Sequence, residues 1–148
     1  MLADVAPPPP LVESSTRFSF GLANPEWLLV GLDHRTGHWG GTLGAGTLML
    51  ASNLHGSLRY YWTERAGGPF LEAGASFLRL SSISDETPRD WKTMAFLGAG
   101  YQWVFGRFST TLGLGFSPFP VPDSTFQSLF VSSARSLPRA LLQFGYAL

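Results

Sequence analysis

Side chains alternate between two kinds along residues 54–80, and this alternation limits the possible folds more than any other feature of the chain. Leucine, tyrosine and tryptophan occupy the even positions from 58 to 62, whereas Ser57 and Arg59 occupy odd positions. After a turn, apolar residues take the odd positions from 71 to 77, and Glu72 and Ser76 take even ones. A period of two residues is that of β-strands whose two faces meet different surroundings.

Similar alternation extends through most of the chain and divides it into eight candidate strands. Their expected bounds are 16–23, 27–33, 40–50, 54–63, 70–80, 92–104, 107–117 and 139–148. These lengths are near the about 9–11 residues with which a tilted strand crosses a bilayer. All prolines after residue 10 fall in turns or beside strand ends, where a missing N–H breaks no ladder. Residues 1–15, with four consecutive prolines, are predicted to form an extended arm, and residues 16–148 the folded domain.

Two hairpin registers follow from the pattern, with turns centred on residues 65–66 and 105–106. The expected pairs are Tyr60 with Leu71, Leu58 with Ala73 and Arg59 with Glu72 in the first hairpin, and Trp103 with Phe108, Tyr101 with Thr110 and Ala99 with Leu112 in the second. Bulky apolar residues then share one face of each hairpin, and small or polar residues share the other.

Composition decides which face meets water. Charged residues make up 14% of the chain, against roughly 25% in ordinary soluble domains, and aromatic residues also reach 14%. The face opposite the apolar one carries mostly Gly, Ser and Thr, too few charges for a typical solvated surface. We therefore predict an all-β fold, a transmembrane antiparallel up-and-down β-barrel with eight strands, a polar lumen and an apolar outer wall.

Two segments have other interpretations. Residues 36–58 lack Asp, Glu, Lys and Arg, so a transmembrane helix is an alternative interpretation there, although the many glycines of this stretch disfavour one. Residues 117–138 are expected to form one long external loop in which Asp123 or Ser124 could cap a short helix. A ninth strand is the alternative there, but it would put the chain termini on opposite sides of the membrane.

Two sets of residues are candidates for defined roles in such a barrel. A polar network in the lumen is expected from His55, Ser57, Arg59, Glu72, Gln102 and Gln143, with Arg59 and Glu72 as its central ion pair. An aromatic girdle at the bilayer interfaces is expected from Trp27, Trp39, Trp62, Trp91 and Trp103, with Phe70 and Phe108 beside the turns.

The stretches "LRYYW", "GPFLEAGASF", "FLGAGYQWVFGRFSTTLGLGF" and "RALLQFGYAL" resemble the small eight-stranded outer-membrane barrels of Gram-negative-type bacteria, of the outer membrane protein A and X kind. The resemblance implies a place in the bacterial outer membrane. It also implies a C-terminal signal for the barrel-assembly machinery, formed by Leu142, Phe144, Tyr146 and Leu148. Leu148 stands where that family usually ends in Phe.

His55, Ser57 and Glu72 also resemble the His, Ser and Glu of outer-membrane lipid A deacylases, in which a histidine base activates a serine nucleophile. Parity points all three residues into the lumen, the motif lies in mid-chain, and no Asn-Ala-Gly follows the serine. We therefore expect a non-enzymatic envelope protein, acting as a scaffold, a surface-recognition module or a subunit of an envelope assembly. A lipid-modifying enzyme is the alternative.

Charge and ligand types limit the partners and cofactors. Ten basic and ten acidic residues cancel, which disfavours nucleic acid as a partner. The chain has no cysteine, so it has neither disulfides nor thiolate chemistry. Asp33, His34 and His38 offer too few ligands, with no fixed geometry, for a metal site. We expect no cofactor, and as partners the lipid bilayer, the barrel-assembly machinery and other envelope proteins.

Overall fold

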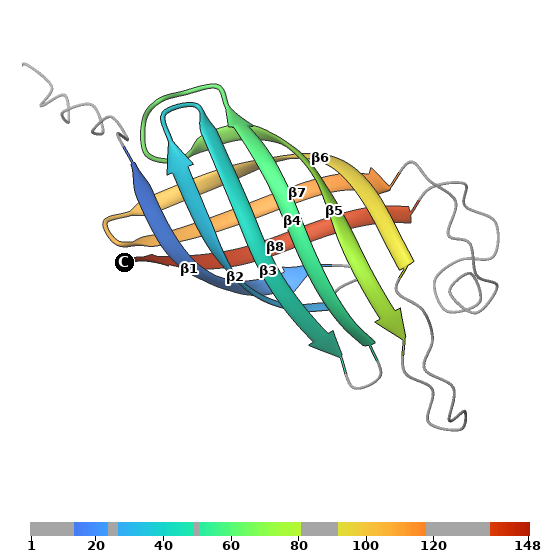
Figure 1. Ribbon diagram of the computed structural model, residues 1–148. Helices are drawn as coiled ribbons and strands as arrows, with labels where there is room; N and C mark the ends of the chain where they lie inside the picture. Colours follow the sequence, from blue (N-terminus) through green and yellow to red (C-terminus); the bar gives the residue numbers. More distant parts are fainter. Residues whose placement is uncertain (1–13, 24–26, 49–50, 81–91, 118–136) are drawn as a thin grey trace, which may run out of the picture.

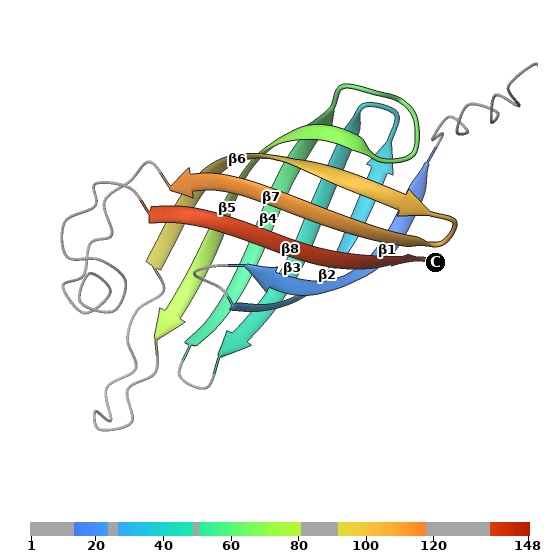
Figure 2. The same ribbon diagram turned by 180° about the vertical axis from the view of Figure 1, so that it is seen from behind.

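The computed structural model describes residues 14–23, 27–48, 51–80, 92–117 and 137–148. These residues form eight antiparallel strands that close into a barrel in the order β1 to β8, as Figures 1 and 2 show from opposite sides. The strands are β1 (Ser15–Ala23), β2 (Trp27–Thr36), β3 (Trp39–Leu48), β4 (Ala51–Tyr61), β5 (Gly68–Leu80), β6 (Lys92–Phe105), β7 (Phe108–Ser117) and β8 (Leu137–Ala147). The predicted all-β class, strand number and barrel architecture are therefore confirmed.

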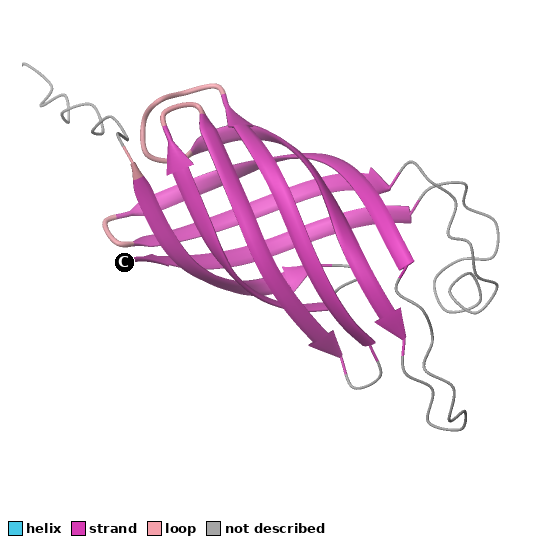
Figure 3. Cartoon of the chain, viewed as in Figure 1, coloured by secondary structure: helices cyan, strands magenta, loops and turns pink. Residues whose placement is uncertain are grey.

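No helix lies among the described residues (Figure 3). None of them therefore belongs to a helix long and apolar enough to cross a membrane. Residues 36–58, for which a helix was one interpretation, contain the end of β2, all of β3 and most of β4. The predicted arm before residue 14 and most of the predicted loop or helix at 117–138 lie outside the described residues.

The three turns that the structure describes lie at one end of the barrel, which we call the turn end. They join β2 to β3, β4 to β5 and β6 to β7, and β1 begins and β8 ends beside them (Figure 1). Two of these turns have only two residues between paired strands, and each begins with a glycine at positive φ: Gly37 at 55° and Gly106 at 62°. A glycine with positive φ at the first turn position matches the twist of the flanking strands.

The register between β4 and β5 is the predicted one, with Arg59 opposite Glu72 and Tyr60 opposite Leu71. The register predicted between β6 and β7 is wrong by two residues. Phe105 continues its strand and pairs with Phe108, so that Trp103 faces Thr110 instead of Phe108. The difference arises because the turn is the tight one that Gly106 permits. A shift of two residues keeps every side chain on its predicted face, since the side-chain period is two.

The barrel is apolar outside and polar inside. Large hydrophobic side chains are exposed on the outer surface along every strand, to 73% at Leu43 and 75% at Leu114. Inside lie charged and hydroxyl- or amide-bearing side chains, and the largest fully buried one is Arg59, which is 2% exposed. A small apolar cluster of Ala23, Leu29 and Leu141 lies inside the barrel toward the end opposite the turns.

Candidate functional site

An ion pair between neighbouring strands forms the centre of the lumen. Because Arg59 and Glu72 are register partners on β4 and β5, both side chains point inward at the same level. Arg59 Nε donates to Glu72 Oε1 at 3.1 Å, and the Ser57 hydroxyl donates to the same oxygen at 2.6 Å. All three side chains are buried, so the carboxylate is neutralised by groups that the strand register already places beside it.

The guanidinium of Arg59 also reaches across the barrel. Its Nη2 donates to Gln143 Oε1 at 3.1 Å, and Gln143 Nε2 in turn donates to Asp33 Oδ2 at 3.0 Å. Asp33 lies 3.7 Å from Arg59 Nη1 and accepts a hydrogen bond from Thr42. Since β4 and β8 are half a turn apart in the closed barrel, the Arg59–Gln143 bond joins opposite walls. We call Asp33, Ser57, Arg59, Glu72 and Gln143 the cross-barrel network.

Two other residues expected in the network lie elsewhere in the lumen. Gln102 is buried and donates to Thr111 Oγ1 on β7 at 3.3 Å. His55 is buried nearer the opposite end and packs edge-on against the Phe96 ring, with centroids 5.9 Å apart. Asp33 is the member that sequence reasoning missed. Its position on β2 between outward-facing Leu32 and His34 was the available signal, but the strand was expected to end there.

The arrangement of Ser57 and Glu72 bears on the deacylase alternative. In a serine hydrolase the histidine lies between the two, accepting the serine proton and donating to the carboxylate. Here the Ser57 hydroxyl donates directly to Glu72, whose same oxygen also accepts from Arg59. The serine proton therefore faces an ion-paired carboxylate rather than an imidazole, which is the geometry of a packed polar network.

Arg35 closes the lumen at the turn end. Its guanidinium donates to three backbone carbonyl oxygens, those of Gly37, Thr63 and Gly67, at 3.0, 2.5 and 3.2 Å. It also stacks over the Tyr61 ring, 3.8 Å from the ring centroid. These contacts hold the β4–β5 turn over the mouth of the barrel, because Thr63 and Gly67 belong to that turn.

Four arginines and two carboxylates are among the buried side chains that the structure describes. The arginines are Arg17, Arg35, Arg59 and Arg139, and the carboxylates are Asp33 and Glu72. Both carboxylates lie within ion-pair distance of Arg59. Arg139, on β8 near the opposite end, stacks over Phe96 at 3.7 Å. The described interior therefore carries more positive than negative charge.

The three tryptophans of the expected girdle whose side chains the structure describes lie on the outer surface. Trp39, Trp62 and Trp103 are 61%, 53% and 39% exposed, and all lie close to the turn end. Phe108 is also exposed, and its ring contacts that of Tyr146. Trp91 and the side chain of Trp27 lie outside the described residues.

Phe70 corrects the expected girdle. It is fully buried, its ring lies 5.5 Å from that of Tyr61, and Arg59 lies 5.0 Å above it. The physical reason is parity: Phe70 shares the inner face of β5 with Glu72, and closeness to a turn does not change which way a strand residue points.

The C-terminal strand alternates as expected. Leu142, Phe144 and Tyr146 of β8 alternate with the buried Leu141, Gln143 and Gly145, and Phe144, Tyr146 and Leu148, which follows the strand, are exposed. The Phe144 ring packs against Phe20 of β1 at 5.6 Å. The outward-facing apolar residues of β8 therefore continue the outer wall formed by β1 across the β1–β8 junction.

Residues weighed as metal ligands point in different directions. Asp33 faces the lumen, whereas the His34 ring is exposed and hydrogen-bonded to Thr16 and Thr36. His38 contacts Glu64 at 3.2 Å and the Tyr61 carbonyl at 2.8 Å. Within the described part of the chain, no three His, Cys, Asp or Glu residues form a group that could hold a metal ion.

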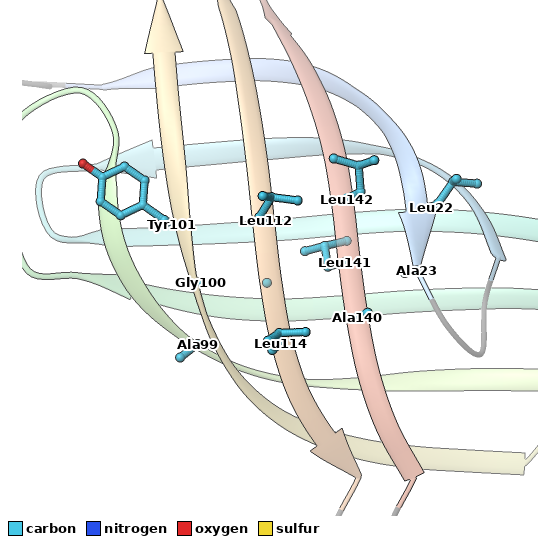
Figure 4. A pocket seen from close by; sticks show the side chains of 11 residues that line it. Leu22, Ala23, Ala99, Gly100, Tyr101, Leu112, Leu114, Ala140, Leu141 and Leu142 are labelled. Carbon is cyan, nitrogen blue, oxygen red and sulfur yellow. The ribbon is translucent and has the colours of Figure 1, made fainter. Parts of the chain in front are cut away.

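An apolar groove of about 900 Å³ lies across β6, β7, β8 and β1 (Figure 4). Tyr101, Leu112 and Leu142 lie along one side, and Ala99, Leu114 and Ala140 along the other. The depression exists because the wall carries small side chains here, so the groove is a property of the outer apolar surface. Comparison of the chain with protein-family models, curated proteins and solved structures gave no match.

Proposed function

We propose that this chain is a membrane-spanning barrel of the bacterial outer membrane, similar to the outer membrane protein A and X kind. In this proposal it serves the cell envelope without catalysis, as a scaffold, a surface-recognition module or a subunit of an envelope assembly. The observation that carries the proposal is the inversion of polarity, with leucines exposed on the outer wall and Arg59 and Glu72 buried inside.

The inversion favours lipid around the barrel for an energetic reason. Soluble monomers rarely expose contiguous apolar patches larger than a few hundred Å². Here exposed Leu, Phe, Trp and Tyr side chains occur on strands all around the barrel, and the groove over β6 to β1 extends the same surface. Hydrocarbon around this wall would remove the apolar side chains from water. Closure gives each of the eight described strands a partner on both sides, as a bilayer requires.

The cross-barrel network favours a scaffold role and disfavours a role as a pore. An eight-stranded barrel has a lumen just wide enough for side chains to fill. The Arg59–Gln143 bond between opposite walls obstructs this lumen at the level of Glu72, and Arg35 holds the β4–β5 turn over the mouth. Solutes would have to break buried, charge-assisted hydrogen bonds to pass.

Recognition of other molecules would fall to the connections at the end opposite the turns. Residues 81–91 join β5 to β6, and residues 118–136 join β7 to β8. Because connections alternate between the two ends of an up-and-down barrel, both leave from the same end. Long connections face the cell exterior in bacterial barrels, and short turns face the periplasm.

Single-cysteine labelling tests this proposal cleanly, because the chain contains no cysteine. We would express Asp85→Cys and, as its matched control, Arg107→Cys with a cleavable signal sequence in a Gram-negative bacterium. A membrane-impermeant maleimide should label Asp85→Cys in intact cells, but Arg107→Cys only after the outer membrane has been permeabilised. Equal labelling of both variants, or recovery of the protein in the soluble fraction, would overturn the proposal.

The variant Ser57→Ala distinguishes the proposed non-catalytic role from the alternative of a lipid-modifying enzyme. In the proposed role, the variant leaves the acyl-chain profile of lipid A unchanged, as measured by mass spectrometry of cells that express either form. A profile that differs between cells with and without the wild-type protein, and reverts with Ser57→Ala, would instead assign a deacylase-like activity.

A further inference from the structure

The positive charge in the lumen is unevenly neutralised. Arg59 lies between the two buried carboxylates, 3.1 Å from Glu72 and 3.7 Å from Asp33. Arg17 and Arg35, by contrast, have no carboxylate oxygen within 4.0 Å among the described residues. A buried charge without a counter-charge is costly, because it has lost the solvation of water and gained no partner.

The two arginines lie next to each other at the turn end. In the β1–β2 ladder, Ser15 faces Arg35 and Arg17 faces Asp33, so the two inward-pointing arginines are diagonal neighbours. Both line one small chamber, whose wall also includes Arg59, Tyr61 and Gln102. Gly145 lies beside the Arg17 side chain: a Cβ added there would be in ordinary van der Waals contact with Arg17, at 3.7 Å, but only 2.6 Å from Ser109 Oγ.

Arg17, which lines this chamber, also carries an unused donor. Arg17 is 8% exposed, and its Nη1 is buried without a hydrogen-bond acceptor among the described residues. The Arg35 guanidinium is held by its three carbonyl contacts, which bring donors but no negative charge to balance it. A buried N–H without an acceptor costs about 1–3 kcal/mol, and more when the group is charged.

We propose that Arg17 and Arg35 bind one small monovalent anion, of the size of chloride, in this turn-end chamber. The anion would accept from Arg17 Nη1 and neutralise the charge that the carboxylates leave over. Asp33 also lines the chamber, but its oxygens already accept from Thr42 and Gln143 and face Arg59. The net charge of the lining remains positive.

The size of the chamber selects the ligand. Its volume of about 10 Å³ corresponds to the space for about one water-sized particle. Phosphate, a lipid headgroup or a peptide carboxylate is much larger than this space, and Arg35 holds the β4–β5 turn that forms part of its wall. A halide is larger than a water molecule but is the smallest of these anions, so we expect the Arg17 side chain to shift when it binds.

Thermal unfolding in different anions tests the site. The barrel would be purified in a non-ionic detergent, and chloride replaced stepwise by gluconate at constant ionic strength and pH. We expect the Tm of the wild type to rise saturably with chloride, by roughly 2–4 °C or more, because a ligand that binds only the folded state stabilises it. Bromide should replace chloride, whereas gluconate should not.

Arg17→Gln should abolish this dependence on chloride, and the matched control Arg107→Gln, on the exposed β6–β7 turn, should retain it. Anomalous diffraction from wild-type crystals grown in bromide gives a second readout that needs no variant, with a peak expected between Arg17 and Arg35. Equal wild-type Tm in chloride and gluconate, or absence of the bromide peak, would show that only water occupies the chamber. The result does not depend on the proposed envelope role, because it is measured on purified protein.

Discussion

At the scale of single residues, Arg59 is the centre of the cross-barrel network described above. Its Nε, Nη1 and Nη2 face Glu72, Asp33 and Gln143 respectively, which come from three other strands. One side chain thus sets the position of groups on β2, β5 and β8. A planar guanidinium suits this role, because its donors point in fixed directions.

We predict that Arg59→Met destabilises the barrel by about 3–5 kcal/mol, because it leaves two buried carboxylates without their shared counter-charge. Urea unfolding of the protein in lipid vesicles, followed by tryptophan fluorescence, measures the change. Arg107→Met is the control, since Arg107 is exposed at a turn. A loss below about 1 kcal/mol for Arg59→Met would mean that the network contributes little to stability.

Two inward-facing glycines should respond differently to a methyl group. A Cβ at Gly74 would lie 2.4 Å from the Gly56 carbonyl oxygen and 2.5 Å from Phe96 Cζ, whereas at Gly113 the nearest atom would be 3.5 Å away. Gly74→Ala should therefore destabilise the barrel by about 1–3 kcal/mol through overpacking, and Gly113→Ala by much less. The same urea titration compares them, and equal effects would contradict the packing described for β4 and β5.

At the scale of elements, the two-residue turns fix how neighbouring strands pair. Gly37 and Gly106 have positive φ, a conformation that costs other L-residues about 1–2 kcal/mol. Nothing lies within 4 Å of a Cβ at either position, so the cost of a substitution is conformational rather than steric.

Gly106→Ala should accordingly lower the free energy of unfolding by about 1–2 kcal/mol. Gly41→Ala serves as the control, because an added Cβ there meets its nearest neighbour at 3.7 Å and no positive φ is involved. Equilibrium unfolding of both variants under the same conditions checks the prediction. If the two behave alike, the strain at the turn is relieved by a change of turn type.

Strand faces could be read from the sequence better than strand ends or registers could. Alternation places Arg59, Glu72 and Gln143 inside whatever the pairing, because parity survives any shift by two residues. The pairing of β6 with β7 could not be obtained in this way, since four-residue and two-residue turns at Gly106 give the same faces. Asp33 was missed because the apolar pattern of β2 ends at Leu32, while the strand continues by backbone pairing to Thr36.

At the scale of the whole molecule, an exposed leucine tests what surrounds the barrel. In water, replacing an exposed side chain usually changes stability by at most about 0.5 kcal/mol. At the middle of a bilayer, an arginine on the lipid-facing wall costs about 2–4 kcal/mol, and near the interface about 0–1 kcal/mol.

We predict that Leu43→Arg, in the middle of β3, destabilises the vesicle-inserted barrel by about 2–4 kcal/mol, and Phe108→Arg, beside a turn, by about 0–1 kcal/mol. Both side chains are more than half exposed, so a soluble barrel would tolerate both changes equally. Urea unfolding in vesicles gives the two values. Two equally small losses would place the outer wall in water.

Cross-lumen contacts were the part of the site that local pattern could not supply. The pair of Arg59 and Glu72 follows from one hairpin, but the bonds from Arg59 to Gln143 and from Gln143 to Asp33 join residues 84 and 110 positions apart. Such contacts depend on the diameter and stagger of the closed barrel, which no single hairpin determines. For the same reason, the chamber beside Arg17 and Arg35 becomes visible only in three dimensions.

The pairing of β1 with β8 determines when the barrel can close. Its ladder runs from the pair Ala23–Leu141 to the pair Arg17–Ala147 and joins the first described strand to the last. In a nascent chain that still lacks β8, one edge of β1 is unpaired and could form hydrogen bonds with a strand of another chain instead. The barrel therefore cannot close before β8 has been synthesised, and until then the pairing edge of β1 stays open.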